Sequence, residues 1–531
     1  MNRLKNFFGD YLVKRILSPT IIFSLLLILL STCPGWGATY YVKNGGNDSL
    51  AGTSDATAWA TIAKVQSTVR SGDTVYFRSQ DTWTGADPLL NAVTGVTYDG
   101  STYGSGTRAT LRATSRVRGY GVVQIYVSNV TFKGFKVDSN YLSIGGIYIG
   151  GTSPTPSGDI SNITVDNCEV TNGITSDNPD PSYYYAILVG ARGTSTTSNV
   201  TVKNCIVHDV GHEGIAVYPH WGATAPNRVN GALIRNNIIY NTGQVPSNRH
   251  KPLSITNDSD NITMEFNTVY NCPAGIGVAN YGPGYTGPDE YPNNFIIRYN
   301  LIDLGGVGTS AFVTNGYFGF PHFYGDGAFY GNILINSKIN LGGLDYHSGS
   351  IKIYNNTVYV PTTVSPPIYM IPNCSNTSGI EIKNNILVTG SQIYPIKDLD
   401  GCLTNHSNNL IYTTRVNEVV LTTARTYKMS DLEDWEPTIQ KTNPNFTGGT
   451  LPTGFSGNYG ESMVPNTNYF LPQVGSPAID NGTALGSPYD GCINGAGLAT
   501  PIIRPRGIAY DIGAYEYFKP PAKPAEVIIV K

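Results

Sequence analysis

Apolar and polar residues alternate over short stretches along most of this chain, and the stretches come in groups of three. One group consists of GALIRN (231–236), NIIYN (237–241) and, after a variable loop, PLSIT (252–256). Successive side chains of a β-strand point to opposite faces, so each stretch would bury every second residue. The pattern predicts a repeating unit of three short strands.

A short motif marks one turn in each unit. It reads apolar, any residue, Asn, Asn or Cys, any residue, apolar, as in VDNCEV (165–170) and IRNNII (234–239). The second Asn-type position falls, in steps of 24 to 37 residues, at 135, 168, 205, 237, 267, 300, 332, 356, 385 and 409. Asn tolerates the left-handed backbone of a turn, and stacked amides can hydrogen-bond along a ladder. Because one unit cannot bury its apolar face alone, the repeat predicts an all-β solenoid of about ten coils.

The repeat resembles the right-handed parallel β-helix of the pectin-lyase-like superfamily over roughly residues 120–415. The right-handedness is implied by this resemblance. Residues 40–77 resemble the N-terminal segment of exported β-helix proteins and predict a capping helix at about 58–70, with Ile62, Val65, Gln66 and Val69 at helical spacing. A solenoid needs such caps to protect its terminal coils.

The other end resembles a C-terminal surface-protein module of the choice-of-anchor type. Its motifs are GSPAIDNG (475–482), RPRG (504–507) and DIGAYEY (511–517). We therefore expect a strand-rich C-terminal cap. The predicted organisation is a signal peptide at 1–38, an N-terminal cap with the first coils at 39–119, β-helix repeats at 120–415, a capping module at 416–517 and a Pro/Lys tail at 518–531.

The first residues are typical of an export signal. Arg3, Lys5, Lys14 and Arg15 precede the apolar run IIFSLLLILL (21–30), and small residues follow, so cleavage is expected after Gly37 or Ala38. We expect a secreted or cell-surface protein that would contact a membrane only through an uncleaved signal.

The amino-acid composition limits the classes of binding partner that we expect. Charged residues make up 13% of the chain, against roughly 25% in typical globular proteins, and the net charge is −3. A nucleic-acid partner would require a basic face, so the net charge argues against one, and we expect none. Hydroxyl, amide and aromatic surfaces favour a polysaccharide or cell-surface glycan, bound by a protein that we expect to be a monomer. Cysteines 168, 205, 272, 374, 402 and 492 match no zinc pattern. Cys168 and Cys205 share one repeat position, where a disulfide and stacked free thiols are both compatible with the spacing.

The stretch HDVGHEGIAVYPHW (208–221) concentrates candidate chemistry. Aligning the strands that follow each variable loop places Ile187, Ile215, Leu253 and Ile276 inward, and Ala186, Gly214, Ala216, Ser254 and Gly277 on a nearly bare outward floor. Two positions earlier, Tyr184, His212 and His250 form one column, and Tyr185, Glu213 and Lys251 form the next. His208 and Asp209 instead fall into columns of Tyr and Asn, as ladder residues.

The alternative is that Glu213 and Lys251 are purely structural. If strict alternation continues backwards along the strand, both side chains point inward as an ion pair, which is costly to bury and need not be functional. His220 and Trp221, in the loop 218–230, fit sugar stacking and plain loop packing equally well.

The resemblance implies a substrate groove along the outward face of this sheet. Polygalacturonase-like hydrolysis is disfavoured because the floor lacks the two carboxylates it needs. A uronate polysaccharide lyase needs a base of moderate pKa, which Lys251, His250 or His212 would supply, and Arg249 would neutralise the substrate carboxylate. The predicted sugar contacts are Tyr184, Tyr185, Trp221 and Tyr281, and Ca²⁺ would be held by Glu213, Asp177 and Asp180.

Two other functions stay open at this level. One is a non-catalytic adhesin or carbohydrate-binding protein, favoured by the surface-module ending and by the absence of a complete catalytic motif. The other is a zinc enzyme that uses His212, His250 and Glu213 as ligands.

Overall fold

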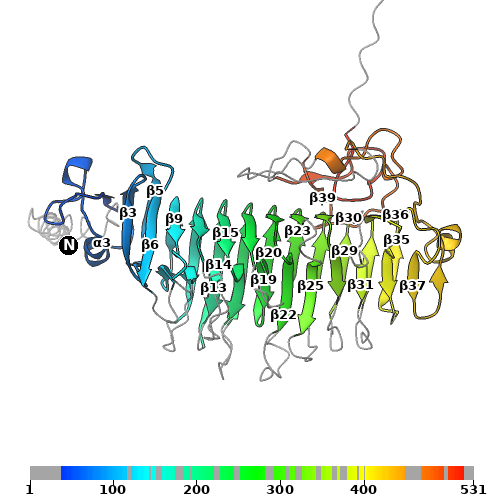
Figure 1. The fold of residues 1–531 in the computed structure, drawn as a ribbon, viewed down its shortest axis with the longest axis horizontal. Coiled ribbons are helices and arrows are strands. Elements are labelled where there is room, and N and C mark those ends of the chain that lie inside the picture. Colours follow the sequence, from blue (N-terminus) through cyan, green and yellow to red (C-terminus); the bar gives the residue numbers. More distant parts are fainter. Residues whose placement is uncertain are drawn as a thin grey trace, which may run out of the picture.

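The computed structural model describes residues 37–115, 121–142, 145–150, 158–173, 185–191, 194–219, 228–243, 251–280, 292–304, 310–316, 326–341, 349–360, 368–370, 379–391, 394–399, 401–448, 468–494 and 500–518. Within them the chain winds into a long row of coils, each with one strand in each of three sheets (Figure 1).

The strands of the three sheets are short and follow one another in chain order. Sheet A contains β1 (Thr39–Val42), β2 (Thr74–Arg78), β5 (Thr97–Tyr103), β8 (Val130–Lys133), β11 (Ile160–Asp166), β14 (Thr196–Lys203), β17 (Arg228–Arg235), β20 (Ser259–Glu265), β23 (Phe295–Arg298), β26 (Gly327–Tyr330), β29 (Ile351–Tyr354), β32 (Ile380–Lys383) and β35 (Leu403–Ser407). Sheet B contains β3 (Thr82–Ala86), β6 (Ala109–Ser115), β9 (Phe135–Asp138), β12 (Glu169–Thr171), β15 (Ile206–Val210), β18 (Ile238–Thr242), β21 (Thr268–Tyr270), β24 (Leu301–Asp303), β27 (Ile333–Ile335), β30 (Thr357–Val360), β33 (Ile386–Thr389) and β36 (Leu410–Thr413). Sheet C contains β4 (Leu90–Asn91), β7 (Val123–Ile125), β10 (Gly145–Ile149), β13 (Tyr185–Ala191), β16 (Glu213–Pro219), β19 (Leu253–Thr256), β22 (Ile276–Asn280), β25 (Ser310–Gly316), β28 (Lys338–Leu341), β31 (Ile368–Met370), β34 (Ile396–Asp398), β37 (Val420–Thr422) and β38 (Thr426–Tyr427).

This strand order defines a parallel β-helix. Neighbours within each sheet pair in parallel, for example β13 with β16 and β17 with β20; the final pair of sheet C, β37 and β38, is antiparallel. The predicted fold class is confirmed. In the described residues sheets A, B and C hold 13, 12 and 13 strands, because strands within residues 39–115 precede the first copy of the motif and β37 and β38 follow the last one. The predicted number of about ten coils is not confirmed. The handedness stays a prediction.

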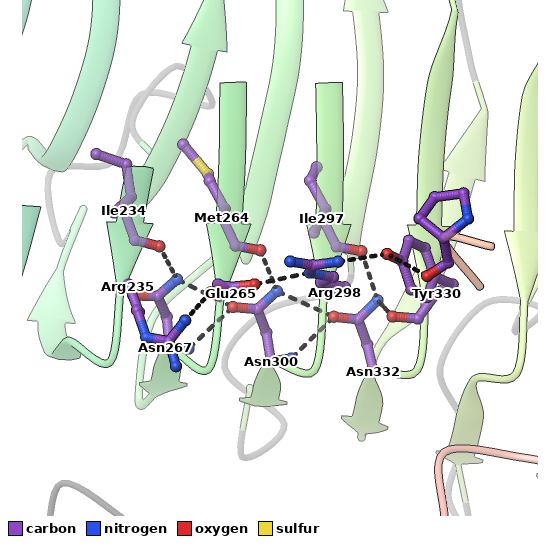
Figure 2. A network of polar contacts seen from close by, with 11 residues as sticks. Ile234, Arg235, Met264, Glu265, Asn267, Ile297, Arg298, Asn300, Tyr330 and Asn332 are labelled. Atoms are coloured by element: carbon purple, nitrogen blue, oxygen red, sulfur yellow. Dashed lines mark hydrogen bonds and ion pairs between the residues drawn. The ribbon is translucent and has the colours of Figure 1, made fainter. Parts of the chain in front are cut away.

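An asparagine ladder runs through the turn between sheets A and B. The Asn300 Nδ2 donates to the carbonyl oxygen of Met264 and to Asn332 Oδ1, each at 3.0 Å, while Asn300 Oδ1 accepts from the backbone N–H of Asn267 at 2.9 Å (Figure 2). The same bonds repeat from Asn237 onward, and the last rung, Asn409, donates to the buried carboxylate of Glu436. The predicted ladder is confirmed.

The residue before each ladder position adopts the left-handed conformation. Asn236, Asn355 and Asn384 have φ between 53° and 58°, and Phe266 and Tyr299 take the same conformation at 56° and 58°. Asn is the residue that meets this requirement at least strain, so its recurrence in the motif has a backbone cause.

The cysteines in the described part of the ladder are thiols. Cys168 and Cys205 are buried and free, and the backbone N–H of Cys205 donates to Asn237 Oδ1 at 2.9 Å. Of the two arrangements that the sequence allowed, the structure shows stacked free thiols. Cys402 is disulfide-bonded.

A row of ionic side chains follows the outer face of sheet A beside this turn. Glu265 accepts from Arg235 and, at 2.7 Å, from Arg298 Nε; Arg298 then donates to Tyr330 Oη at 2.8 Å, and that hydroxyl donates to the carbonyl oxygen of Pro488 (Figure 2). The row thus connects the coils to the C-terminal segment.

The N-terminal end is closed by the helix α3 (Ile62–Thr68), which follows the short 3₁₀ helix η1 (Asp55–Thr57). Thr61 caps α3 by accepting from the Lys64 N–H at 3.1 Å. Ile62, Val65 and Val69 are buried in the main core, as predicted, although the helix is shorter than expected.

The C-terminal segment does two things. Val419, Leu432 and Ile439, around the 3₁₀ helix η3 (Met429–Asp434), close the last coil. The segment then turns back along the solenoid and packs on the outer face of sheet B, from β24 to β36 (Figure 1). Its described part contains η4 (Asn468–Phe470) and the short pair β39 (Gly491–Cys492) and β40 (Ile502–Ile503). The module therefore covers a side of the solenoid as well as its end.

Among the residues that the structure describes, no helix has both the length and the apolarity needed to cross a membrane. The predicted signal segment lies mostly outside those residues.

Candidate functional site

One row of side chains defines the outer face of sheet C. Tyr148, Leu188, Ala216, Ser254 and Gly277 are register partners on successive strands. Each lies between residues of the main core, so the row faces outward. We call it the outer row. The predicted strand alignment and this part of the predicted floor are correct.

The alternation is interrupted two positions before the outer row, at Ala186 in β13 and at Gly214 in β16. Ala186 belongs to the main core although the next residue, Ile187, is also inward. A Cβ atom on Gly214 would lie 3.1 Å from Ile239 Cγ2, inside the core. Assigning Ala186 and Gly214 to the outward floor was therefore wrong: both strands place two consecutive residues inward.

Because of this interruption, the preceding residues face outward. Tyr185 packs with the outer-row residues Tyr148 and Leu188, and Glu213 accepts a hydrogen bond from the outer-row Ser254 Oγ at 2.6 Å. The stem of Lys251 lies over Gly277, where a Cβ atom would be 2.9 Å from Lys251 Cγ. The inward orientation that strict alternation gives to Glu213 and Lys251 is wrong.

Glu213, the first residue of β16, lies beside Lys251, which precedes the neighbouring strand β19 by two residues. The Gly214 N–H donates to the Lys251 carbonyl oxygen at 3.2 Å, which aligns the two residues across the sheet. Burial raises the pKa of Glu213 to about 7, against the opposing effects of the Ser254 hydrogen bond and the Lys251 charge. Burial likewise lowers the pKa of Lys251, and the Glu213 charge opposes that shift. The pair consists of an acid and a base that both titrate closer to neutrality than usual.

Aromatic rings border this pair on the N-terminal side. The rings of Tyr185 and Tyr218 are stacked with centroids 5.6 Å apart, and Tyr148 approaches Tyr185 at 6.4 Å. All three tyrosines are at most 6% exposed. They form a packed aromatic wall beside the polar pair.

The remaining predicted site residues have different outcomes. His212 lies directly before β16 and is 7% exposed, and its carbonyl oxygen accepts from the Gly243 N–H at 2.8 Å. The others lie outside the residues that the structure describes, namely His250, Arg249, Tyr184, Trp221, Tyr281, Asp177 and Asp180. Their convergence on Lys251 stays a prediction.

His208 and Asp209 occupy the ladder columns that their spacing predicts. The His208 ring stacks on Tyr240 with centroids 4.9 Å apart, and Asp209 Oδ1 accepts from Asn241 Nδ2 at 3.0 Å. His208 also lies between Asp209 and Glu169, and its hydrogen bond helps lower the pKa of Glu169 to about 2. These residues face outward from sheet B, away from the Lys251 site.

Sequence reasoning missed three contributors. Ser254 was placed on the floor but not recognised as the donor to Glu213, and Tyr148 and Tyr218 were not singled out. Extending the aligned columns by one strand, to GGIYI (145–149), would have found Tyr148. Nothing in the sequence marks the interrupted alternation that turns Glu213 outward.

The strand order and this outer face define the molecule as a parallel β-helix protein. No protein-family model and no curated protein sequence matches the chain. Among solved structures, the A-module of the mannuronan C-5 epimerase AlgE6 from Azotobacter vinelandii is 14% identical, with a TM-score of 0.46, over 70% of this chain and 89% of that chain. Pectate lyase Pel9A is 15% identical, with a TM-score of 0.45, over 91% and 97%. The Dettilon tailspike protein is 14% identical, with a TM-score of 0.44, over 76% and 69%. Similarity at this level carries no functional conclusion.

Proposed function

We propose that this protein is exported and acts on extracellular uronate-containing polysaccharide as a lyase, at the outer face of sheet C. The observation that carries the proposal is the outward pair Glu213 and Lys251, set beside the aromatic wall and over the small residues Ser254 and Gly277. Ser254 and Gly277 are small and tyrosine rings suit apolar sugar faces, but Ser254 and the three tyrosines are almost fully buried, so a sugar chain would have to displace what covers this face.

Lys251 is the proposed base. Elimination breaks the C–H bond α to the uronate carboxylate, forms a carbon–carbon double bond and expels the glycosidic oxygen, which takes up a proton. An ordinary lysine is protonated at neutral pH, and the lowered pKa of Lys251 raises its fraction of neutral amine above that of an ordinary lysine. Ionised Glu213 holds that pKa up and thereby tunes the base.

Charge on the substrate must also be neutralised. We propose Arg249 for the carboxylate, and His250 and His212 as alternative bases. A calcium ion at Asp177 and Asp180 belongs to the same proposal. Glu213 itself fits such an ion poorly, because its pKa is raised and an ammonium group lies beside it. The proposed elimination requires no step through Ca²⁺, and no group of three potential metal ligands occurs among the described residues.

The test is ultraviolet absorbance of the unsaturated product when the mature protein is incubated with a panel of uronate polysaccharides. We expect a signal that Lys251→Ala abolishes and that Lys203→Met, a change on the outer face of sheet A, leaves intact. A signal unaffected by Lys251→Ala would rule out this base, and His250→Ala and His212→Ala would then be compared.

A second candidate function is a non-catalytic carbohydrate-binding protein. It is favoured by the burial of Glu213, which is 6% exposed, and of Ser254, which is fully buried, because a catalytic pair would need an open groove. Retained binding of a polysaccharide by affinity electrophoresis, with no absorbance on any substrate, would support this function over the lyase.

A further inference from the structure

Tyr141, in the loop between β9 and β10, has a backbone conformation that is unusual for an aromatic residue. In the described part of the chain, four residues other than Gly, Asn and Asp are left-handed, namely Tyr141, Phe266, Tyr299 and Glu418. Phe266 and Tyr299 are buried in the apolar cluster between sheet B and the C-terminal segment, and Glu418 forms an ion pair with Arg415. Tyr141 has a φ of 56° and is 53% exposed. Burial therefore does not account for a tyrosine at this position.

The same loop already contains a residue that suits a left-handed backbone. Asn140, directly before Tyr141, has a φ of 52°, and Asn172 on the next coil has a φ of 57°. Asn and Gly adopt this conformation with little strain, whereas a bulky side chain makes it costly. Strained residues that persist are concentrated at binding and catalytic sites, so the strain at the exposed Tyr141 indicates a contact with something outside the chain.

The backbone that carries the Tyr141 ring is held in place by hydrogen bonds. The Tyr141 N–H donates to the Asn172 carbonyl oxygen at 2.7 Å. The side chain of Asn140 donates to the Ala113 carbonyl oxygen at 3.0 Å and accepts from Arg112 Nη2 at 2.6 Å. A ring on a fixed backbone loses little conformational freedom when it binds a ligand, which favours affinity.

The loop leads to the edge of sheet C at which Glu213 and Lys251 lie. Gly145, the first residue of β10, aligns with Tyr185, Tyr185 aligns with Glu213, and the strand of Lys251 follows that of Glu213. The coils of Tyr141 and Lys251 are thus three strand spacings apart, about 14 Å along the solenoid at roughly 4.8 Å each. A polysaccharide lying along sheet C at Lys251 would reach Tyr141 on the N-terminal side.

Tyr141 also differs from the aromatic wall in its accessibility. The three rings of the wall are at most 6% exposed, whereas Tyr141 is 53% and the adjacent Leu142 is 41% exposed. A sugar chain can therefore contact these two residues without displacing what covers the wall. An exposed tyrosine ring beside an aliphatic side chain suits the apolar face of a sugar, because the sugar hydroxyls at its edge stay in water.

We propose that Tyr141 and Leu142 form a stacking platform for one sugar unit of the polysaccharide, about three coils from Lys251 on the N-terminal side. The proposal rests on the proposed function for the identity of the ligand. It adds that the preferred ligand is a chain long enough to reach from Lys251 to Tyr141, and that this unit is recognised through its apolar face.

The test is calorimetric binding of oligouronates in the Lys251→Ala background, which prevents the proposed elimination from consuming the ligand. Tyr141→Asn removes the ring and keeps a residue that suits the backbone. We expect it to weaken long oligomers about tenfold, to leave those too short to span about 14 Å unchanged, and to raise the midpoint of thermal unfolding. Tyr141→Phe, which keeps the ring, should stay within about twofold.

A matched control is Phe518→Asn. Phe518 is 60% exposed in the C-terminal segment, so this variant removes a comparably exposed ring away from sheet C and should leave the affinity unchanged. With Lys251 intact, Tyr141→Asn should raise the KM for long substrates and leave kcat unchanged, because the platform touches a sugar unit that does not react.

Four results would overturn the platform. The first is unchanged affinity for long oligomers in Tyr141→Asn, and the second is an equal loss in Tyr141→Phe, which would assign the contact to the hydroxyl. A lower unfolding midpoint in Tyr141→Asn would show that the ring stabilises the fold. A smaller particle in sedimentation of Tyr141→Asn than of the unsubstituted protein would show that the ring contacts a second copy of the chain.

The platform and the lyase fail separately. Length-dependent binding through Tyr141, without any unsaturated product from the unsubstituted protein, would reject the lyase and keep the platform. Turnover that depends on Lys251, with unchanged KM in Tyr141→Asn, would reject the platform alone. If no polysaccharide of the panel binds, both proposals are wrong.

Discussion

The turn between sheets A and B and the start of each sheet C strand both recur in every coil, yet they behave in opposite ways. At the turn, one residue type repeats and its amides bond to one another from Asn237 to Asn409. At the start of the sheet C strands, the aligned residues are Tyr185, Glu213 and Lys251, which share no chemistry. A ladder requires identical neighbours, whereas an outward position without a ladder is free to vary. The candidate site lies at positions where the repeat does not require a particular residue type.

The ladder should produce the largest effect when broken. Asn300→Leu would leave the Asn267 N–H and side-chain amide and the Met264 carbonyl oxygen without their partner inside the core. Orphaned buried groups cost about 1–3 kcal/mol each, so we expect a loss of about 4 kcal/mol in the free energy of unfolding, measured by denaturant titration. Asn199→Gly is the matched control, because Asn199 belongs to an exposed Asn ladder and Gly retains its left-handed backbone. Similar losses for both variants would contradict a special role for the buried ladder.

The second-largest expected effect is a pH dependence of the free energy of unfolding that is caused by Glu213. Its folded-state pKa of about 7 lies above the ordinary 4.5, so the folded protein holds this proton more tightly than the unfolded chain does. The associated stability is complete below pH 4.5 and is lost as the pH rises to about 7, by at most about 3 kcal/mol. Glu213→Gln should remove this dependence and be more stable than the wild type at pH 8, in thermal unfolding across the pH range.

An exposed carboxyl provides the control for that measurement. Glu418→Gln removes the same charge at a position with a 52% exposed side chain, and it should leave the pH dependence between 4.5 and 7 as in the wild type. If Glu213→Gln follows the wild-type curve as closely as Glu418→Gln does, the carboxyl of Glu213 is not desolvated.

The sequence predicted the ladder and the fold for the same reason. Asn at positions such as 237 and 300 is required by backbone conformation and by stacked hydrogen bonds, so it recurs and is readable. The alignment that follows also gave the correct register for Ile187 and Ile215. The orientation of Glu213 was not readable, because the interrupted alternation depends on backbone geometry at Ala186 and Gly214 that no residue type signals. The hydrogen bond from Ser254 to Glu213 depends on that orientation, so the sequence did not predict it either.

Two glycines test the corrected orientation directly. A Cβ atom on Gly214 would lie 2.4 Å from the Pro252 carbonyl oxygen and would enter the core, so Gly214→Ala should lower the free energy of unfolding by about 2 kcal/mol. On Gly277 it would press outward on the Lys251 stem, so Gly277→Ala should change stability little and reduce turnover of the polysaccharide. Strict alternation predicts that both positions are outward and that both changes are tolerated by the fold. Equal stability of the two variants in thermal unfolding would therefore support the orientation that strict alternation predicts, with Gly214 facing outward.

The smallest effect is a shift in the pH dependence of the proposed elimination. The rate should rise with pH as Lys251 loses its proton, and the negative charge of Glu213 opposes that loss. Glu213→Gln removes the charge, so the rising limb should move to lower pH by about one unit, the usual effect of one nearby charge. Ser254→Ala should move it in the same direction by less, because losing the Ser254 hydrogen bond keeps Glu213 protonated to higher pH. Initial rates against pH would show both shifts, and a limb that moves to higher pH in Glu213→Gln would mean that the titrating base is not Lys251. Glu213 and Lys251 would then contribute to substrate binding only, and the catalytic base would have to be sought at His212 or His250.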